Sequence, residues 1–287
     1  EGGSKVDFRD PKIWREADGT YRCVAGNRPA DGSGQILLYS SPDGFHWKFE
    51  SVLAENKNRF GLMWVCPDFF QLDGKYVLLT SPQDMLPSGF EYHNGNGTLC
   101  LIGSFDEQSK TFQEERDQAI DYGIDFYAPQ TLLAPDGRRI MIAWMQNWDT
   151  LSIASLKAPW FGQMTVPREL SIKNGRLYQC PVRELDGLRS GRVSYQNVDF
   201  QGELTLEGIK GRKVDVTITL RPGDEEHIYK KFSVWFGQDD TYHTAISFRP
   251  YESVLKIDRK FSGSRRAIIH QRRCKVPQNG GNITFRM

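Results

Sequence analysis

A diverged repeat constrains the fold of this chain more than any other feature of its sequence. The segments DPKIWREADGTYRCVAGNR, CPDFFQLDGKYVLLTSPQ and APQTLLAPDGRRIMIAWMQ share one layout, with a proline, a short apolar run, an Asp-Gly pair and a second apolar run. Their prolines are Pro11, Pro67 and Pro129, which lie 56 and then 62 residues apart. Three matches at this spacing indicate that one structural unit recurs along the chain.

Each unit is predicted to contain four antiparallel strands. The Asp-Gly pairs begin at Asp18, Asp73 and Asp136, and Gly accepts the positive φ that a tight hairpin turn requires. The stretches QILLYSSPDGFHWKFESVL and GTLCLIGSFDEQSKTFQEE continue the first two units with a strand, a turn and an outer strand. Four-stranded units at this spacing are typical of a β-propeller. No segment of 12 or more residues shows the apolar period of a helix, so an all-β fold is predicted.

The repeat ends before the last hundred or so residues of the chain. There the alternating segments KVDVTITLRP, FSVWFGQ, HTAISFRP and SVLKIDRK indicate an antiparallel β-sandwich. We therefore expect a propeller domain of about three blades over residues 1–186 and a sandwich domain over residues 187–287. Because propellers usually close with about four to eight blades, and because the last segment is the apparent strand GNITFRM, the sequence is expected to be a fragment that lacks N-terminal blades and the end of the sandwich.

Composition narrows the partners that the chain is expected to have. Lys and Arg total 37 against 36 Asp and Glu, and with both signs interspersed no basic stripe suggests nucleic acid. No apolar run of about 18 residues suggests a membrane-spanning helix. The five cysteines are widely spaced and form no CxxC pair, which favours free thiols in a reducing compartment and predicts no metal site.

Five motifs, taken in order, resemble those of glycoside hydrolase family 32: FRDPKIW, MWVCPDFF, GIDFYAPQT, IAWMQNW and GQMTVPREL. The resemblance runs from about residue 7 to the end of the chain. It implies a five-bladed propeller followed by a β-sandwich, and a small carbohydrate substrate such as sucrose, sucrose-6-phosphate or a fructan. It implies no cofactor, since two carboxylates suffice for this hydrolysis. The wording of WFGQMTVPREL and the reduced-looking cysteines favour the cytoplasmic bacterial branch of the family.

The same resemblance assigns catalytic roles to two positions. A retaining glycosidase needs a carboxylate nucleophile and a carboxylic acid about 5 to 5.5 Å apart. By resemblance, Asp10, with Arg9 beside it, holds the fructose hydroxyls and stabilises the transition state. The family's acid/base is the Glu of a Glu-Cys-Pro motif, and this chain has Val65 at that position. Asp68 is a poor substitute, because residues at odd offset along a strand face opposite sides.

These departures predict that the chain as given is inactive or nearly so. The family's nucleophile lies in an Asn-Asp-Pro-Asn motif, and that motif is absent from the sequence. Valine cannot transfer a proton, and general acid catalysis typically contributes about 10² to 10⁴-fold in rate.

Further residues are candidates for holding the sugar. Four aromatic residues lie near the ends of predicted inner strands, where a propeller mouth would gather them: Trp64, Tyr127, Trp144 and Trp148. The alternative for each is a place in the core, and the resemblance favours Trp144 and Trp148 without separating them. Asp125 is either an acceptor for sugar hydroxyls or a turn carboxylate. Arg168 and Glu169 are expected to form a structural ion pair.

Three interpretations follow from the sequence. The leading one is a retaining β-fructofuranosidase that hydrolyses the fructosyl bond of sucrose or sucrose-6-phosphate, inactive in this chain. The alternative is a non-catalytic carbohydrate-binding propeller that kept Asp10 and the aromatic residues but lost its acid. The third is a structural remnant of a truncated gene.

Overall fold

The computed structural model divides the chain into two compact units, Glu1–Val182 and Arg183–Met287, and each is described by itself. The described residues are 2–146, 148–149, 162–224, 226–263 and 269–287. Among them, no helix has the length and the apolar character needed to cross a membrane.

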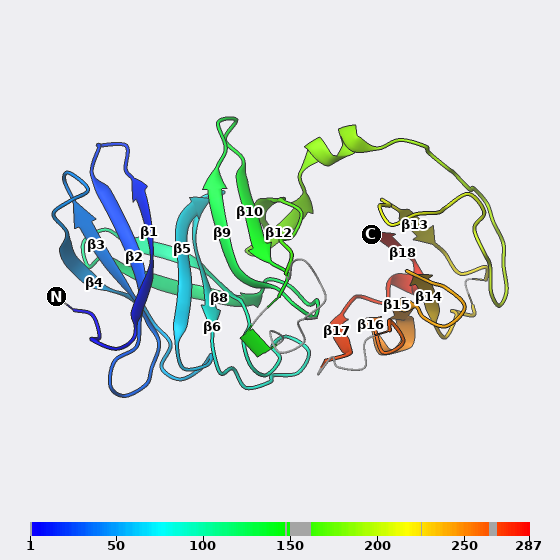
Figure 1. Cartoon of the computed structure of the whole chain (residues 1–287), viewed down its shortest axis with the longest axis horizontal. Coiled ribbons are helices and arrows are strands. Elements are labelled where there is room, and N and C mark those ends of the chain that lie inside the picture. The colour runs from blue at the N-terminus through cyan, green and yellow to red at the C-terminus, as the bar shows by residue number, and fades with distance from the viewer. Residues whose placement is uncertain (1, 147, 150–161, 225, 264–268) are drawn as a thin grey trace. The chain divides into compact units, whose positions relative to one another are not determined.

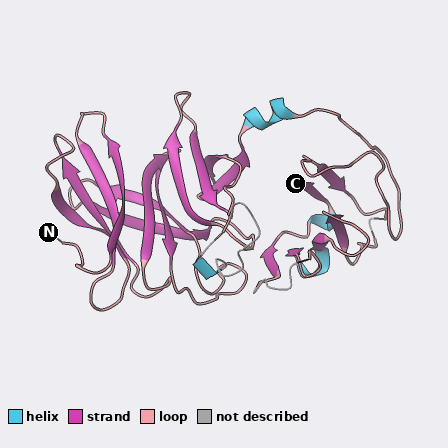
Figure 2. Ribbon diagram, viewed as in Figure 1, coloured by secondary structure: helices cyan, strands magenta, loops and turns pink. Residues whose placement is uncertain are grey.

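The N-terminal unit consists of three four-stranded antiparallel sheets, each formed by strands in sequence order (Figures 1 and 2). The first sheet contains β1 (Phe8–Arg15), β2 (Tyr21–Asn27), β3 (Gln35–Ser41) and β4 (Lys48–Glu55). The second contains β5 (Trp64–Leu72), β6 (Lys75–Pro82), β7 (Leu99–Asp106) and β8 (Thr111–Ala119). The third contains β9 (Tyr127–Leu133), β10 (Arg139–Trp144), β11 (Arg168–Lys173) and β12 (Arg176–Pro181).

These sheets are three blades of a propeller, as the repeat predicts. Strand β5 contacts both β1 and β9, so the first strands of the three blades lie side by side. Each predicted Asp-Gly pair forms the turn of the first hairpin in its blade, and Gly19, Gly74 and Gly137 have φ of 91°, 79° and 86°. These values lie in the region that glycine adopts without steric cost.

The middle blade is buried on both faces, which explains its nearly continuous apolar strands. Along β6, Leu78 points into a cluster around Trp64 that includes residues of the first blade. Its neighbours Val77 and Leu79 point the other way, into a cluster that includes Met141 of the third blade. Successive side chains on a strand face opposite sides, so one strand supplies both interfaces between blades.

The first strand of every blade is distorted at the same point. The residue that precedes the repeated proline has positive φ in all three blades, 60° at Asp10, 50° at Cys66 and 50° at Ala128. The strand pairing shifts register there each time, as in a β-bulge. A residue before proline normally adopts extended backbone, and a non-glycine residue in the left-handed region costs about 1–3 kcal/mol. At the bulge, successive side chains of the strand no longer alternate regularly between the two faces of the sheet.

The strands in the described part of the C-terminal unit form two sheets. It begins with the short 3-10 helix η2 (Arg183–Leu188), and residues 189–216 form no strand or helix. One sheet has the order β14-β15-β16-β17 and the other pairs β13 with β18. The bounds are β13 Thr217–Leu220, β14 Phe232–Phe236, β15 Thr244–Arg249, β16 Val254–Asp258, β17 Gln271–Lys275 and β18 Ile283–Arg286, with the short 3-10 helices η3 (Pro250–Glu252) and η4 (Asn279–Gly281).

The two sheets face each other, as in the predicted sandwich. The ring of Phe285 on β18 stacks on that of Phe232 on β14, with centroids 5.8 Å apart. Strand β17 was not predicted, because its sequence QRRCK has no apolar alternation. It forms because its backbone pairs with β16 along its whole length.

Candidate functional site

The bulged starts of the inner strands bring several of the predicted site residues together. Val65 and Tyr127 are in one small buried cluster, and Trp144 and Cys66 pack against it. Asp10 joins this group across the blade interface, because one of its carboxylate oxygens accepts hydrogen bonds from Cys66, from the backbone N–H at 3.1 Å and from Sγ at 3.4 Å. The site is therefore built where three blades meet.

Asp10 and Cys66 influence each other's chemistry. Burial, helped by the negative charge of Asp10, raises the pKa of the Cys66 thiol to about 12. The thiol therefore keeps its proton at neutral pH and can donate it to the carboxylate. Asp10 remains a hydrogen-bond acceptor with one oxygen held by Cys66.

Val65 is 3% exposed, and its side chain touches apolar groups. Its backbone carbonyl accepts a hydrogen bond from Thr80 Oγ1 at 3.1 Å. Desolvation favours the neutral form of a carboxyl group, so a glutamate at this position would have a raised pKa, as a general acid requires. Valine, by contrast, supplies no proton.

Asp68 is buried between blades and has partners from both of its neighbours. Its side chain is 1% exposed and lies between blades, where Oδ2 accepts the backbone N–H of Thr131 at 2.6 Å. Lys12 Nζ lies 3.4 Å from the same oxygen. Burial raises the pKa of Asp68, and the nearby Lys12 works against that rise. The carboxylate is engaged in contacts between blades instead of facing a substrate.

Arg9 and Trp64 lie apart from this group. Arg9 forms an ion pair with Asp7, two residues before it. Trp64 is 0% exposed and packs in the core between the first two blades, where its Nε1 donates a hydrogen bond to the carbonyl of Phe60 at 2.9 Å. Because the ring presents no face to solvent, Trp64 is a packing residue in this structure and offers no platform to a sugar.

The other aromatic residues differ in what they expose. Tyr127 is buried, and burial raises the pKa of its hydroxyl. Trp144, at the end of β10, is half-buried, and its ring meets that of Trp148 edge to face with centroids 5.5 Å apart. Trp148 is 55% exposed, so it has an open ring face beside the group. Asp125 is half-buried in the segment that leads into β9.

Arg168 and Glu169 do not pair with each other, which corrects the expectation from the sequence. Adjacent residues on a strand face opposite sides, and each side chain finds its own partner. Arg168 lies 2.8 Å from Asp121, and Glu169 lies 2.8 Å from Arg138.

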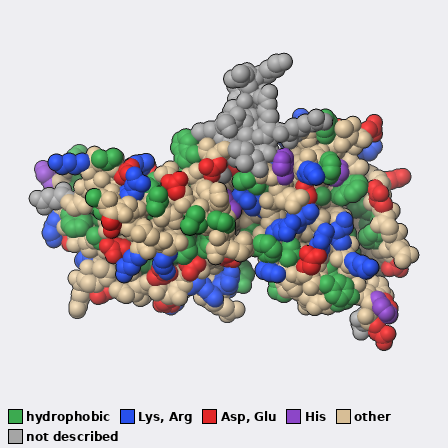
Figure 3. Space-filling model, turned by 90° about the horizontal axis from the view of Figure 1, so that it is seen from below, with side chains coloured by type: hydrophobic (Ala, Val, Ile, Leu, Met, Phe, Trp, Pro, Cys, Tyr) green, Lys and Arg blue, Asp and Glu red, His purple; other side chains and the backbone are tan. Residues whose placement is uncertain are grey.

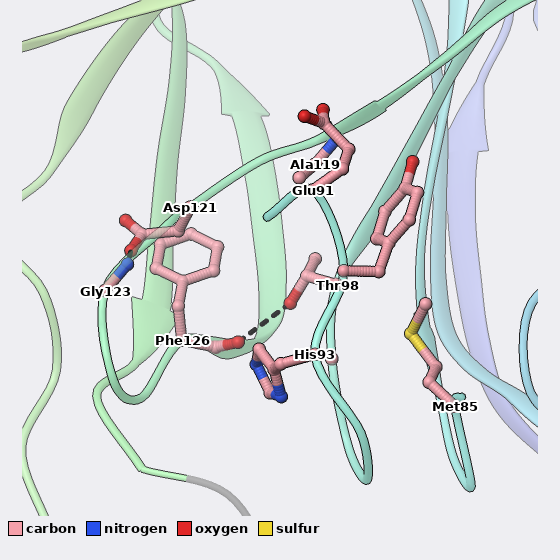
Figure 4. A pocket seen from close by; sticks show the side chains of 10 residues that line it. Met85, Glu91, His93, Thr98, Ala119, Asp121, Gly123 and Phe126 are labelled. Atoms are coloured by element: carbon pink, nitrogen blue, oxygen red, sulfur yellow. Dashed lines mark hydrogen bonds between the residues drawn. The ribbon is translucent and has the colours of Figure 1, made fainter. Parts of the chain in front are cut away.

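A small pocket lies beside the loops that precede β7 and β9 (Figure 4). Figure 4 shows Asp121 and Phe126 on one side of it and Met85 on the other. Glu91 is part of the lining, and its carboxylate accepts the backbone N–H of Ala119 at 3.2 Å. The residues that line this pocket in the described chain do not include Asp10, so the pocket is distinct from the group described above.

Two polar residues at the inner strands were missed in the sequence. Lys12 Nζ donates hydrogen bonds to Gln130 Oε1 at 3.2 Å and to the carbonyl of Thr131 at 2.8 Å. Lys12 and Gln130 each follow the repeated proline, as Asp68 does in the second blade. Aligning the repeats by these prolines would have singled out the three positions. The described residues contain no group of three or more His, Cys, Asp or Glu placed to hold a metal ion.

Comparisons with known proteins agree with this architecture. The sequence model described as "Glycosyl hydrolases family 32 N-terminal domain" matches residues 1–181. The raffinose invertase of Escherichia coli is 39% identical over 223 residues, which are 77% of this chain and 46% of that protein. The sucrose-6-phosphate hydrolase of Bacillus subtilis is 32% identical over 279 residues, which are 94% of this chain and 56% of that protein. The chain thus spans about half the length of the curated relatives it matches.

Solved structures of proteins from the same family have a similar fold. A mutant GH32 beta-fructofuranosidase of Bombyx mori in complex with sucrose has a TM-score of 0.75 at 30% identity, covering 98% of this chain and 57% of that one. The sucrose-6-phosphate hydrolase of Lactobacillus gasseri, at 24% identity, has a TM-score of 0.79 over 98% of this chain and 56% of its own, which shows a shared fold. With the match over residues 1–181, these findings confirm the resemblance: the chain belongs to glycosyl hydrolases family 32.

Proposed function

We propose that this chain is part of a retaining β-fructofuranosidase of the bacterial cytoplasm that acts on the fructosyl bond of sucrose or sucrose-6-phosphate, and that the chain itself does not hydrolyse the bond. The site belongs to a propeller domain over residues 1–186, which a sandwich domain over residues 187–287 follows. The names of the relatives and the sucrose bound in the Bombyx mori structure support this substrate class.

One observation carries the proposal. The Asp10 carboxylate is held at the bulge beside Val65, with Trp144 next to them and the open ring of Trp148 at the edge. In our mechanism Asp10 accepts hydrogen bonds from fructosyl hydroxyls and stabilises the positive charge that develops on the sugar. Trp148 offers its ring to a sugar face, while Tyr127 and Trp144 pack beneath the site. The proposal keeps Asp125 as a predicted sugar contact but not Arg9, because the side chain of Arg9 is paired with Asp7.

Two functions are missing from this arrangement. Val65 offers no proton to the leaving oxygen, so that oxygen would depart as an alkoxide, at a cost of about 10² to 10⁴-fold in rate. The sequence also lacks the Asn-Asp-Pro-Asn motif that carries the nucleophile in the family. The chain is therefore expected to hold sugar without cleaving it.

A fusion protein tests the proposal. The part of the Escherichia coli raffinose invertase that precedes its match to this chain is joined ahead of the chain, and fructose release from sucrose and sucrose-6-phosphate is measured. Val65→Glu in the fusion should raise release by about 10² to 10⁴-fold. The matched control is Val65→Gln, which has the same size but no acidic proton. Equal rates for the two variants would mean that the acid has been misplaced.

A second candidate is a non-catalytic carbohydrate-binding protein. The apolar packing of Val65 with Met63 and Tyr127 favours it, because valine suits these surroundings and transfers no proton. Calorimetric titration of the unmodified chain with sucrose separates the candidates when it is combined with the fusion. Binding by the chain, together with a fusion that stays inactive after Val65→Glu, would favour the binding protein.

A further inference from the structure

Three polar residues occupy the same place in successive blades. Lys12, Asp68 and Gln130 each come directly after the repeated proline and therefore directly after the bulge. None of the three belongs to the group of Asp10, Val65 and the aromatic residues, and the proposed mechanism does not use them. Their side chains nevertheless meet, although Lys12 and Gln130 are 118 residues apart in the sequence.

Hydrogen bonds link Lys12 to Gln130, Gln130 to Cys66 and Cys66 to Asp10, and the backbone from Asp10 to Lys12 closes the ring. Lys12 Nζ donates to Gln130 Oε1 at 3.2 Å, and Gln130 Nε2 donates to the carbonyl of Cys66 at 3.1 Å. The N–H of Cys66 donates to Asp10 at 3.1 Å, and Asp10 lies two residues before Lys12 on the same strand. The ring thus passes through the first strand of all three blades.

Asp68 keeps the lysine in place within this ring. The Lys12 side chain is only 25% exposed, and the carboxylate of Asp68, 3.4 Å away, is its counter-ion. Asp68 also accepts the N–H of Thr131, and Lys12 donates to the carbonyl of that same residue. Removing either charge would leave the other uncompensated in a poorly solvated place. The Lys12 ammonium group is therefore held both by an ion pair and by hydrogen bonds.

The Cys66 peptide is the point at which the ring acts on Asp10. Its carbonyl is bound to Gln130 and its N–H to Asp10, so both polar groups of a strained residue have assigned partners. The orientation of this peptide sets where the donor for Asp10 lies. Gln130 fixes that orientation, and Lys12 fixes Gln130.

We propose that Lys12, Asp68 and Gln130 form a clamp between blades that positions the Asp10 carboxylate through the Cys66 peptide. The three are positioning residues, since they reach the site through Cys66. The value of the clamp for sugar binding rests on the proposed function, but the clamp itself can be tested without any sugar.

The thiol of Cys66 reports on the contact with Asp10 in the full chain. Alkylation by iodoacetamide proceeds through the thiolate, so its rate at Cys66, followed by peptide mass spectrometry from pH 7 to 11, depends on how strongly the thiol is held protonated. Asp10→Asn is the reference for loss of the contact. A fall of one unit in the thiol pKa raises the rate at pH 9 about 10-fold.

Lys12→Met and Gln130→Met break the clamp in different ways. The first removes the ammonium group. The second removes the amide that donates to the Cys66 carbonyl and adds no charge beside the thiol, so it isolates the loss of the Asp10 contact. Both should alkylate Cys66 at pH 9 up to about 10-fold faster than the parent chain and approach the profile of Asp10→Asn. Lys12→Arg, which keeps the charge and can donate, should restore the slow rate.

Lys75→Met is the matched control. It removes a lysine of the same unit whose partner, Glu115 at 2.7 Å, lies on the surface, and the Cys66 profile should not move. If Gln130→Met melts as the parent does and leaves the Cys66 profile unchanged, the clamp does not position Asp10 and the proposal fails. If Cys66 responds as expected while the parent chain binds no sucrose in the calorimeter, the clamp stands and the proposed function fails.

Discussion

The two units of the chain bury their apolar residues to very different extents. In the N-terminal unit the middle blade is covered on both faces, and buried clusters fill both interfaces between blades. In the described part of the C-terminal unit, the buried apolar side chains are Phe248, Pro250, Val254 and Phe285. The free energy gained on folding increases with the apolar area removed from water. The candidate site is thus built on the part of the chain with the denser core.

The C-terminal unit also carries a local excess of positive charge. Between residues 249 and 275 the sequence contains nine Lys and Arg but only two Asp and Glu. Figure 3 shows Lys and Arg side chains gathered over one face of the C-terminal unit. The balanced total therefore conceals a local excess, which corrects the expectation that the signs are evenly interspersed. Because like charges repel, this local excess should lower the stability of a unit that already has the smaller core.

The largest expected effect tests the difference between the cores. Trp64→Ala should lower the free energy of unfolding of the N-terminal unit by about 3–5 kcal/mol, because the closely packed blades cannot collapse into the space left by the ring. Phe248→Ala should cost the C-terminal unit less, since fewer buried side chains surround it. Urea unfolding followed by hydrogen exchange assigns each loss to its unit. Equal losses at the two sites would contradict the comparison, and Trp64→Phe is the conservative control.

A smaller effect concerns alkaline pH. Burial raises the pKa of Cys23 to about 11, and burial with the charge of Asp10 raises that of Cys66 to about 12. Above pH 9 these thiols lose their protons in the unfolded chain but keep them in the folded one. The stability of the N-terminal unit should therefore fall between pH 9 and pH 12, by roughly 1–3 kcal/mol per thiol.

Thermal melts between pH 8 and pH 11 measure this loss. Replacing both thiols, as in Cys23→Ala with Cys66→Ala, should reduce the pH dependence of the N-terminal unit and leave the part that belongs to Cys100, whose pKa is also raised by burial. A slope that is unchanged after the double replacement would mean that Cys23 and Cys66 do not contribute to the alkaline limit.

The smallest effect belongs to the surface of the C-terminal unit. Arg286 and Arg189 lower the pKa of Asp215 to about 2, so the stabilisation by this ionised carboxylate is present above its usual pKa and is lost as the pH falls toward 2. Asp215→Asn should cost about 0–1 kcal/mol at pH 7, since exposed ion pairs are screened by solvent. The cost should shrink further in 1 M NaCl. A loss that does not respond to salt would show that the pair is not a screened surface contact.

Local turn chemistry made much of the fold predictable. The Asp-Gly pairs and the repeated prolines determine where each blade begins, because only certain residues suit those backbone angles. The placement of Val65 at the position of the family's acid came from the sequence and stays a prediction. Neither the burial of Trp64 nor the pairing of Arg9 with Asp7 was, because both depend on which face of a strand meets a neighbouring blade.

The rest of the site required tertiary structure. The positive φ of Asp10 contradicts what a residue before proline normally adopts, and it is maintained by contacts with another blade. Likewise, Lys12 and Gln130 are far apart in sequence, and only the packing of the three blades brings them together. Strand β17 has no apolar alternation to reveal it, since pairing with β16 holds it in the sheet.

The bulge has the same backbone conformation in all three blades, whatever side chain it carries. A carboxylate, a thiol and a methyl group occupy corresponding places at Asp10, Cys66 and Ala128, on one backbone form. The same backbone conformation therefore accepts different side chains at these three positions. Substitutions at these three positions and at their immediate neighbours, such as Val65, should therefore leave the backbone fold unchanged. The three blades offer a ready frame on which new combinations of reactive groups can be installed.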